Sequence, residues 1–347
     1  MSVPRLTVLM TVRNGEPYLR EAVASILGQT YRDFRFLILD NASTDASREV
    51  IRCFGDSRIE LVELPEDLGQ TAALNKGLDM VETPWVARMD ADDVSLPERL
   101  ERQMEYLQGR SELVLMGTGV QVIDGRGQFV RERNVVVADV DIRWRQLLGT
   151  SGILHSAAMF SITAIREVGG YPIQYRYAQD YALWFRLLAV GQAANLPQRL
   201  VHIRAHEANV TDFERAEREI RCILQERLRQ LCPDEADETL AATAAALRGL
   251  SSDAAVAPSH AVFSCLTDLP ARFRRECGGD PGGAQLRRYG HRWLNMARRA
   301  SVWSTAGALN WIRLAVRVHP GLLMDGRFWY TLARMVIAPV TRPAPSA

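Results

Sequence analysis

The sequence predicts an α/β protein built on a doubly wound sheet, and three observations support this. Short apolar segments alternate with helix-patterned segments four times within about the first hundred residues. The apolar segments show no polar alternation, which is typical of strands buried on both faces. They also end in polar or acidic residues, as strands do when the carboxyl edge of a sheet carries a binding site.

The first part of the chain is expected to hold four strands and four helices. Continuous apolar, β-branched residues place the strands at 6–12, 34–39, 58–62 and 85–89. Apolar residues three and four positions apart place the helices at 19–27, 44–51, 72–80 and 96–107. Ser43 or Thr44 is expected to cap the second helix. Ser95 and Glu98 are expected to form a capping box for the fourth.

The pattern changes after the fourth helix. A hairpin is expected from residues 113–123 and 129–137, around a turn that contains glycine. Two further strands are expected at 157–162 and 200–204, with helices at 142–148 and from Asp180 onward. This mixture of strands and helices is expected to complete the same sheet.

The chain divides into four parts on this interpretation. Two halves of one α/β domain are expected, and from Thr211 the sequence is patterned for helices. The Pro-rich end is expected to be disordered. The predicted parts are residues 1–115, 116–210, 211–336 and 337–347.

The composition is that of a globular protein, with 47% hydrophobic and 24% charged residues among 347. A formal net charge of +1 gives no electrostatic reason to expect a nucleic-acid partner. Five scattered cysteines argue against a disulfide framework or a zinc cluster, and for a reducing compartment. The first residues show no secretory signal, and no apolar run approaches the ~20 residues of a membrane span. We therefore expect a cytoplasmic protein.

A basic, aromatic stretch lies near the C-terminus, where arginines and tryptophans recur between residues 287 and 311. This pattern is typical either of a helical cap packed on the main domain or of helices that lie on a membrane surface. Peripheral association with the inner face of the membrane, through the C-terminal helices, is therefore an open alternative.

The strongest chemical signal is the acidic run Asp90, Asp92 and Asp93, directly after the strand at 85–89. Three carboxylates within four residues repel one another unless a cation lies among them. Carboxylate oxygens suit Mg²⁺ or Mn²⁺, and such an ion at the carboxyl edge of a sheet suits a diphosphate. The alternative is a solvated acidic loop, and the surrounding sequence has to decide between the two.

The segments around this run resemble family 2 glycosyltransferases, which have the GT-A fold. The resemblance covers the chain up to about residue 211. It rests on residues 11–19, 25–30, 40–45, 69–77, 90–93, 169–171, 179–184 and 204–206, in the family's order. Each piece alone is a weak signal, but the ordered set is specific. It implies a GT-A-type doubly wound mixed sheet and an inverting transfer from a nucleotide-diphospho-sugar donor.

The resemblance assigns the nucleotide of the donor to the first two strand ends. It implies that Thr11 and Asn14 lie beside the nucleotide and that Asp40 borders the base. The commoner family pattern has a second aspartate where this chain has Asn41. An asparagine side-chain oxygen can still accept the N3–H of uracil or thymine. We therefore expect a UDP- or dTDP-sugar, although Asn41 leaves other nucleotides open.

For the diphosphate, the resemblance implies a metal ion. Asp92 would be the main ligand, with Asp90 and Asp93 reaching the ribose, a phosphate or the metal's waters. His206 falls where some relatives place a further metal or phosphate ligand, and the alternative is an ordinary loop histidine. Imidazole suits Mn²⁺ better than Mg²⁺. Either cofactor, Mn²⁺ or Mg²⁺, would neutralise the charge that grows on the departing diphosphate.

Asp180 is the expected catalytic base. The resemblance places at this helix start the carboxylate that deprotonates the acceptor hydroxyl. An aspartate there could instead serve only as the N-cap of the helix. A base works best when its pKa is raised towards the working pH, so we expect partial burial near Tyr181 or Trp184.

Three further residues have implied contacts and simpler alternatives. Lys76 and Arg88 are candidate partners of the phosphates, or else solvated surface charges. His155 is a candidate contact of the acceptor or the diphosphate, or else an ordinary loop histidine.

Together, these residues predict an inverting, metal-dependent glycosyltransferase. It would move a hexosyl or deoxyhexosyl group to a hydroxyl of a glycan or lipid-linked acceptor, and cell-surface polysaccharide assembly is the expectation by analogy. A nucleotidyltransferase acting on sugar phosphates is one alternative, for which residues 13–16 make a poor triphosphate loop. A non-catalytic sugar-binding protein on the same fold is the other, and the intact acidic residues argue against it.

Overall fold

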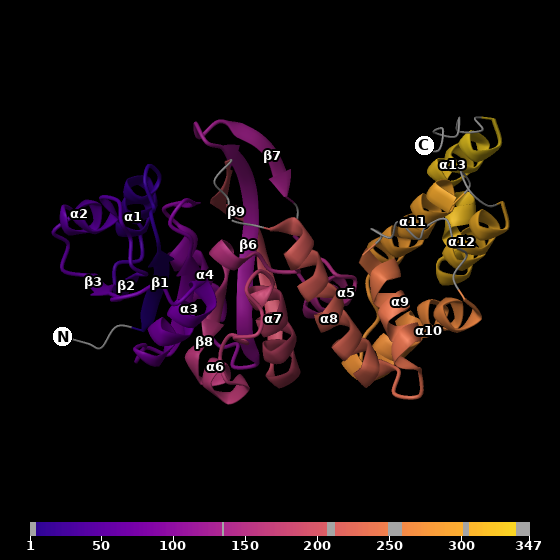
Figure 1. Ribbon diagram of the computed structural model, residues 1–347, viewed down its shortest axis with the longest axis horizontal. Helices are drawn as coiled ribbons and strands as arrows, with labels where there is room; N and C mark the ends of the chain where they lie inside the picture. The colour runs from indigo at the N-terminus through magenta and orange to yellow at the C-terminus, as the bar shows by residue number, and fades with distance from the viewer. Residues whose placement is uncertain (1–4, 134, 207–211, 249–258, 301–304, 338–347) are drawn as a thin grey trace. The chain divides into compact units, whose positions relative to one another are not determined.

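The computed structural model describes residues 5–133, 135–206, 212–248, 259–300 and 305–337. The chain forms two compact units. We call residues 1–146 and 151–219 the sheet unit, because they hold the strands of Figure 1. Residues 147–150 and 220–347 form the C-terminal unit. Nearly all of the tail predicted at 337–347 lies outside the described residues.

The described strands form one mixed sheet. They are β1 (Leu6–Val12), β2 (Phe34–Asp40), β3 (Ile59–Glu63), β4 (Trp85–Met89), β5 (Val94–Ser95), β6 (Leu113–Asp124), β7 (Phe129–Arg133), β8 (Met159–Ser161) and β9 (Gln192–Ala205). Their order is β3-β2-β1-β4-β8-β6-β9-β5, with β7 paired to β6. The first four strands are parallel, whereas β8 runs antiparallel to both of its neighbours. The predicted fold class is confirmed.

Strand β1 shows why the strands could be recognised from the sequence. All of its residues are buried, and it lies between β2 and β4. Val8 and Met10 pack in one hydrophobic cluster, while Leu9 packs in another on the opposite face. A strand covered on both faces is apolar at every position, which is the pattern the sequence shows.

Helices cover both faces of this sheet. They are α1 (Leu19–Leu27), α2 (Ser47–Arg52), α3 (Gln70–Asp79), α4 (Arg99–Leu107), α5 (Asp139–Leu147), α6 (Ile162–Val168) and α7 (Gln179–Val190). Apolar residues of α1 and α4 share the cluster that holds Val8, and those of α3, α6 and α7 share the cluster that holds Leu9. The sheet is therefore doubly wound, with two separate cores.

The predicted helix caps were wrong. Helix α2 begins only at Ser47, because Ser43 Oγ accepts the N–H of Asn14 at 2.9 Å instead of capping a helix. Ser95 belongs to β5, and its hydroxyl accepts a hydrogen bond from the side chain of Gln29 at 3.1 Å. Local sequence favoured caps at both places, but contacts with distant residues use the same hydroxyl groups.

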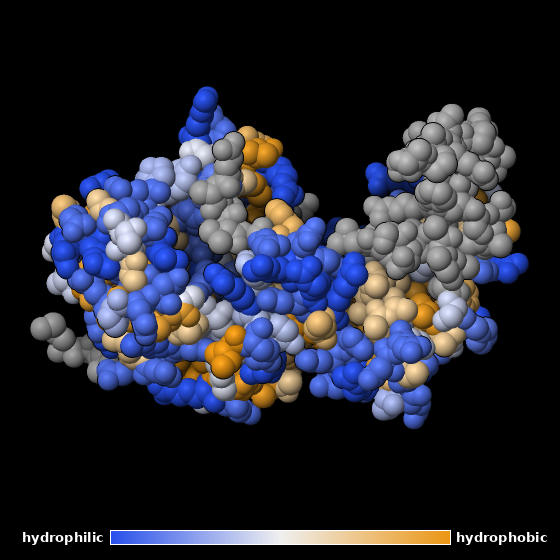
Figure 2. Space-filling model, viewed as in Figure 1, coloured by the Kyte–Doolittle hydropathy of each residue, from blue (hydrophilic) through white to orange (hydrophobic). Residues whose placement is uncertain are grey.

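The second half of the sheet differs in detail from its prediction. The predicted hairpin of β6 and β7 is confirmed. Apolar residues gather over β7 on the surface that Figure 2 shows. The last strand, β9, is much longer than residues 200–204, because it pairs with β6 in parallel along nearly all of its length. The strand predicted at 157–162 is shorter, because His155–Ala157 forms a 3₁₀ turn, η1.

The C-terminal unit is helical. Its helices are α9 (Asp237–Arg248), α10 (His260–Cys277), α11 (Gly283–Ala300), α12 (Thr305–Val318), η3 (Pro320–Met324) and α13 (Gly326–Ile337), while α8 (Phe213–Leu231) begins in the sheet unit. Its core contains a stacked pair, Trp293 and Trp311, with ring centroids 5.4 Å apart. None of the helices in the described ranges combines the length and apolar composition of a membrane span.

Candidate active site

The acidic run lies at the carboxyl end of β4, on the edge where the parallel strands β1 and β2 also end. Asp90 is held from two sides. One of its carboxylate oxygens pairs with the guanidinium of Arg88, and the other accepts the hydroxyl of Ser156. The backbone N–H of Asp90 donates to the same hydroxyl at 3.2 Å. Burial would raise the pKa of Asp90, but Arg88 and His155 hold it below its ordinary value.

Arg88 is a fully buried cation at the base of the site, with 0% of its side chain exposed. Its Nη1 contacts Asp90 and Ser156. Its Nε and Nη2 have no hydrogen-bond partner among the described residues. A buried guanidinium with two unsatisfied donors costs free energy unless an anion or water completes it. The prediction of a surface charge for Arg88 is therefore excluded, and a role beside an anion fits.

Asp92 and His206 form the part of the site that is open to solvent. Asp92 Oδ2 lies 3.0 Å from His206 Nε2, and the two side chains are 30% and 12% exposed. Burial and the neighbouring Asp90 raise the pKa of Asp92, although His206 opposes this. The ring of His206 also lies against that of Tyr18, with centroids 4.7 Å apart. A carboxylate and an imidazole nitrogen therefore meet at one point of the sheet edge.

These two groups could hold a divalent ion only together with other ligands. The described residues contain no cluster of three or more histidine, cysteine, aspartate or glutamate side chains that would enclose a metal. Mg²⁺ and Mn²⁺ in nucleotide sites commonly take one or two protein ligands and fill the remaining positions with phosphate oxygens and water. The pair of Asp92 and His206 fits such an ion.

Asp93 points away from this pair. It is almost fully buried, and its Oδ1 accepts the backbone N–H of Arg204 at 2.8 Å. Burial, with Asp90 and Asp92 adding to it, raises the pKa of Asp93 well above its ordinary value. The guanidinium of Arg204 in turn donates to the backbone oxygen of Asp92 at 2.9 Å. Asp93 thus fixes the acidic loop to β9 rather than reaching outward.

Asp180 lies in the first turn of α7. Its Oδ1 accepts the N–H of Tyr181 at 2.7 Å, and Ala178 rather than Asp180 is the N-cap residue of the helix. A pure capping role is therefore excluded. Burial raises the pKa of Asp180 to about 6, while the charges of Arg88 and Asp90 act on it in opposite directions. The carboxyl group is thus within electrostatic range of the acidic loop.

His155 lies in η1, just before Ser156, which contacts Asp90. Its Nε2 shares a 2.8 Å hydrogen bond with the hydroxyl of Tyr171. Burial, with Arg88 adding to it, lowers the pKa of His155 well below its ordinary value, so the imidazole is neutral near pH 7. The ring also meets that of Trp184 edge-on, with centroids 6.1 Å apart. A neutral histidine here can donate or accept one hydrogen bond to a bound ligand.

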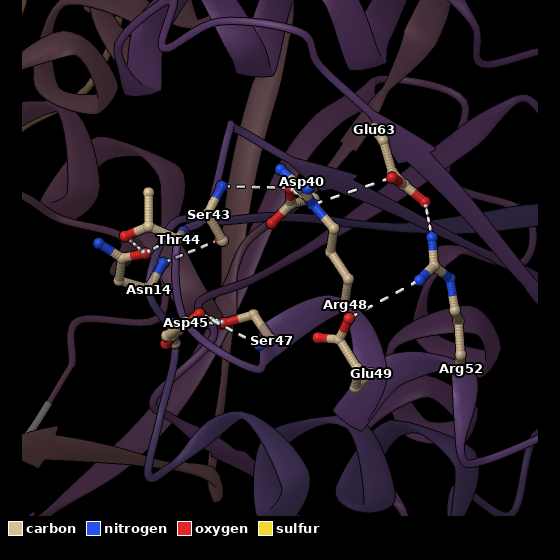
Figure 3. Close-up of polar contacts among 11 residues, drawn as sticks. Asn14, Asp40, Ser43, Thr44, Asp45, Ser47, Arg48, Glu49, Arg52 and Glu63 are labelled. Carbon is tan, nitrogen blue, oxygen red and sulfur yellow. Dashed lines mark hydrogen bonds and ion pairs between the residues drawn. The ribbon is translucent and has the colours of Figure 1, made fainter.

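The ends of β1 and β2 form a second polar group, shown in Figure 3. Asp40 is fully buried, and its Oδ2 accepts hydrogen bonds from Arg48 at 2.6 Å and from the N–H of Ser43 at 3.2 Å. Its Oδ1 has no partner among the described residues. Arg48 lies between Asp40 and Glu63 (Figure 3). A buried carboxylate oxygen without a donor is suited to an N–H of a ligand.

The neighbouring residues hold the loops in place. Asn14 Oδ1 accepts the N–H of Thr44 at 2.8 Å, which ties the loop after β1 to the loop after β2 (Figure 3). The side-chain amide of Asn41 donates to Asp67 at 2.7 Å, and its oxygen accepts the N–H of Leu68 at 3.0 Å. The Asn41 side-chain oxygen, which was predicted to accept an N–H of the nucleotide base, therefore already accepts one hydrogen bond. Thr11, near the end of β1, is almost buried.

Comparison with known proteins agrees with this arrangement. The family model described as Glycosyl transferase family 2 matches residues 7–169. The O-antigen biosynthesis glycosyltransferase WbnJ of Escherichia coli is 30% identical over 209 residues, which are 58% of this chain and 80% of WbnJ. The chain belongs to the family 2 glycosyltransferases. The resemblance found in the sequence is confirmed.

Other members of the family are matched over less of their length. The uncharacterized glycosyltransferase MJ1057 of Methanocaldococcus jannaschii is 30% identical over 193 residues, so the match spans 54% of this chain and 66% of that protein. The matches to MJ1057 and to WbnJ each cover little more than half of this glycosyltransferase.

Solved structures confirm the GT-A-type fold over nearly the whole chain. S. aureus TarS 1-349 in complex with UDP-GlcNAc superposes with a TM-score of 0.58 at 14% identity, covering 92% of each chain. The mannosyltransferase PcManGT of Pyrobaculum calidifontis, solved with GDP-Man and Mn²⁺, superposes with a TM-score of 0.50 at 17% identity, covering 93% of this chain and 88% of its own. At such identities the likeness concerns the fold alone.

Within this glycosyltransferase, the structure brings most of the predicted residues together, but not Lys76. Asp90, Asp92, Asp93, Arg88, His155, Asp180 and His206 gather at the ends of β4, η1, α7 and β9. Lys76 is exposed in the last turn of α3. No hydrogen bond or ion pair joins it to the acidic loop in the described part of the chain.

Several residues of the site were missed from the sequence. Ser156 and Tyr171 lie beside residues that had been singled out, but a serine and a tyrosine carry no spacing signal of their own. Arg99 is buried and donates to the backbone oxygen of Arg88 at 2.8 Å. Its place on the apolar face of a helix was the one signal that could have found it.

Glu219 is the most distant of the missed residues. Its carboxylate accepts the backbone N–H groups of Arg176 at 3.0 Å and of Tyr177 and Ala178 at 2.8 Å each. These residues lead directly into the first turn of α7, which carries Asp180. Helix α8 is laced with charges throughout, so nothing in the sequence distinguishes this glutamate from its neighbours.

Proposed function

We propose that this family 2 glycosyltransferase transfers a sugar, with inversion, from a UDP- or dTDP-sugar to a hydroxyl of a glycan or lipid-linked acceptor. The observation that carries the proposal is Asp180, a largely desolvated carboxyl group with a pKa of about 6 beside the acidic loop. A carboxylate with a pKa near the working pH is a competent general base. The complex of TarS with UDP-GlcNAc and the O-antigen role in the name of WbnJ support the donor class and the polysaccharide context.

The chemistry follows from the position of this base. The ionised Asp180 accepts the proton of the acceptor hydroxyl as the hydroxyl oxygen attacks the anomeric carbon of the donor. The new glycosidic bond forms as the bond between that carbon and the diphosphate oxygen breaks. The attack comes from the side opposite the leaving group, so a single displacement inverts the configuration. The base form is lost below pH 6, and transfer should fall about tenfold per pH unit there.

Asp92 and His206 are the residues that would hold a divalent ion in the donor complex. The 3.0 Å contact between a carboxylate and an imidazole suits Mn²⁺ in particular, and PcManGT was solved with Mn²⁺. When bound, the ion supplies Lewis-acid stabilisation of the leaving diphosphate. Arg88 adds a fixed cation in the same region, and its two unsatisfied donors support a role towards an anionic ligand.

Asp40 is the proposed contact for the base of the nucleotide. Its buried Oδ1 has no donor among the described residues, and an N3–H of uracil or thymine would satisfy it. Asn14 and Asn41 then act mainly through the loops that they tie together, because their side-chain oxygens already accept backbone N–H groups. Thr11 lies beside them at the end of β1.

The test is the variant Asp180→Asn with UDP-GlcNAc, UDP-glucose and dTDP-glucose as donor probes and Mn²⁺ present. Transfer should fall by about 10²–10⁴-fold, because an amide cannot accept the proton. Calorimetry should show donor affinity within about twofold of the parent. Asp79→Asn, at an exposed position of α3, is the matched control and should transfer normally. Unchanged turnover in Asp180→Asn would rule out the proposed base.

A further inference from the structure

Strand β7 carries two arginines, Arg131 and Arg133, on one face of its hairpin with β6. The register pairs Arg133 with Val120 and Arg131 with Val122 of β6. Residues that face each other across an antiparallel pair share one face of the sheet, so these four side chains lie on the same face. Glu132 points to the opposite face, where Arg199 of β9 forms an ion pair with it at 2.5 Å.

This face leads to Asp180. Val120 packs in a small cluster with Leu154 and Ala157, which flank His155 in the chain. Asp180 is the one carboxylate whose charge contributes appreciably to the pKa of Arg133. Arg131 acts on the same guanidinium as a second positive charge. Arg133 therefore lies within electrostatic range of Asp180, on the face of β6 and β7 whose residue Val120 packs against the turn that carries His155.

Neither arginine has its charge compensated by a close partner. Within the residues that the structure describes, no hydrogen bond or ion pair joins the guanidinium group of Arg131 or Arg133 to another group. Burial lowers the pKa of Arg133 below its ordinary value. Arg133 is half-buried and Arg131 is exposed. For the partly desolvated Arg133 the lack of a partner is unfavourable, and a charge-assisted, bidentate hydrogen bond to an anion would offset that cost. In contrast, Arg199 on the opposite face already forms an ion pair with Glu132.

The sheet order separates these arginines from the donor. The nucleotide end of the site is at β1 and β2, on one side of β4. Strands β8 and β6 lie on the other side of β4, and β7 lies beyond them as the partner of β6. An anion bound by β7 therefore lies on the acceptor side of the acidic loop, not beside the nucleotide.

We propose that Arg131 and Arg133 of β7 form a subsite for an anionic group of the acceptor, a phosphate or a carboxylate, next to the hydroxyl that Asp180 deprotonates. This inference rests on the proposed function, because it takes Asp180 as the base. The same strand exposes Phe129 and Val130, which are 60% and 53% exposed, and apolar residues gather there in Figure 2. An acceptor that carries both an anionic group and an apolar part would match this strand.

Saturation-transfer NMR with three probes that differ in charge tests the subsite. The probes are methyl glucoside, methyl glucuronide and methyl glucoside 6-phosphate, each titrated in the presence of saturating UDP and Mn²⁺. At least one anionic probe should bind about ten- to hundredfold more tightly than methyl glucoside. Arg133→Gln and Arg131→Gln should each remove most of this preference. The two anionic probes distinguish a phosphate from a carboxylate.

Controls separate the possible failures. Arg199→Gln, the paired arginine on the opposite face, should keep the full preference. Equal binding of neutral and anionic probes, or a preference that survives in Arg133→Gln, would overturn the subsite. An anionic preference that is present without UDP and disappears at saturating UDP would also overturn it, because the arginines would then serve the diphosphate. The proposed function fails separately, through loss of donor binding or through normal transfer by Asp180→Asn.

Discussion

The sheet unit buries a few of its charged side chains at the candidate site, whereas the last helices of the C-terminal unit carry an excess of positive charge. Arg88 and Arg99 are fully buried beside three aspartates, and every one of these side chains has a specific partner. In contrast, residues 283–347 contain ten arginines and one carboxylate, Asp325, in a chain whose net charge is +1. The core of this second unit is aromatic instead, with Tyr289, Trp293 and Trp311 packed together.

This contrast indicates that the sheet unit is the place for a reaction and the C-terminal unit the place for binding a charged partner. Buried, partnered charges shift one another's pKa values and fix geometry, which a reaction requires. A one-sided surface charge does neither, but it attracts an oppositely charged partner at long range. Five variants, in order of decreasing expected effect, test whether the two units differ in this way.

Arg88→Met should cost the most. The change leaves Asp90, whose side chain is 30% exposed, without its cation. Removing one member of a fully buried pair costs about 3–5 kcal/mol of the free energy of unfolding, so this partly buried pair should cost about 2–4 kcal/mol. Urea unfolding followed by circular dichroism measures this loss. Arg102→Met is the matched control, because Arg102 is exposed and pairs with Glu98 on the surface of α4. That change should cost less than about 1 kcal/mol.

Asp180→Asn should stabilise the fold at neutral pH. Burial raises the pKa of Asp180 to about 6 in the folded state, from an ordinary value of 3.8. The stability that goes with the protonated carboxyl is complete below pH 4 and is lost as the pH rises through 6. The amide avoids this loss, so the variant should gain about 1–3 kcal/mol at pH 8. Urea unfolding at pH 5 and pH 8 checks that the gain grows with pH; an equal gain at both values would contradict it.

His206→Ala should weaken the dependence of donor binding on Mn²⁺. The change removes one of the two proposed protein ligands, so the affinity for UDP in the presence of Mn²⁺ should fall by at least about tenfold. Affinity measured with chelator should change little. His202→Ala, in β9 just before His206, is the matched control. If calorimetry finds equal UDP affinity with and without Mn²⁺ in the parent, the metal assignment fails.

The surface arginines of the C-terminal unit should give the smallest effect per residue. The membrane contact considered for these helices stays a prediction, and Arg287, Arg288 and Arg327 are exposed beside the exposed Trp329 and Met324. Binding to vesicles with 30% anionic lipid should weaken by about fivefold, roughly 1 kcal/mol, for each of Arg287→Gln and Arg288→Gln. Arg102→Gln, a change in the sheet unit, should leave binding to these vesicles unchanged. Equal binding to neutral vesicles would contradict an electrostatic contact.

The sequence was a good guide wherever one local pattern decides the outcome. The apolar run of β1, Asp90 after β4 and Asp180 at the start of α7 follow from periodicity and order along the chain. The family resemblance then brought Asp180 and His206 into one site, which local patterns alone could not do. The long β9 was only partly seen, because its pairing with β6 extends through residues that are not patterned as a strand.

The sequence was a poor guide wherever a side chain has two competing partners. Ser43 and Ser95 look like helix caps but contact distant residues. Arg88 looked as much like a surface charge as like a phosphate ligand, and only the fold shows that it is buried. The face on which Arg131 and Arg133 lie depends on the register of a hairpin, which a sequence does not specify.

The three hydrogen bonds accepted by Glu219 have a consequence for how the chain may be shortened. The region that matches the family model ends at residue 169, and the last strand ends at Ala205. A fragment cut at residue 169 would lose Asp180, and one cut at Ala205 would retain Asp180 but leave three N–H groups before α7 without their acceptor. The shortest fragment that keeps Asp180, the proposed base, supported therefore extends to Glu219, two turns into a helix that contributes nothing to the sheet.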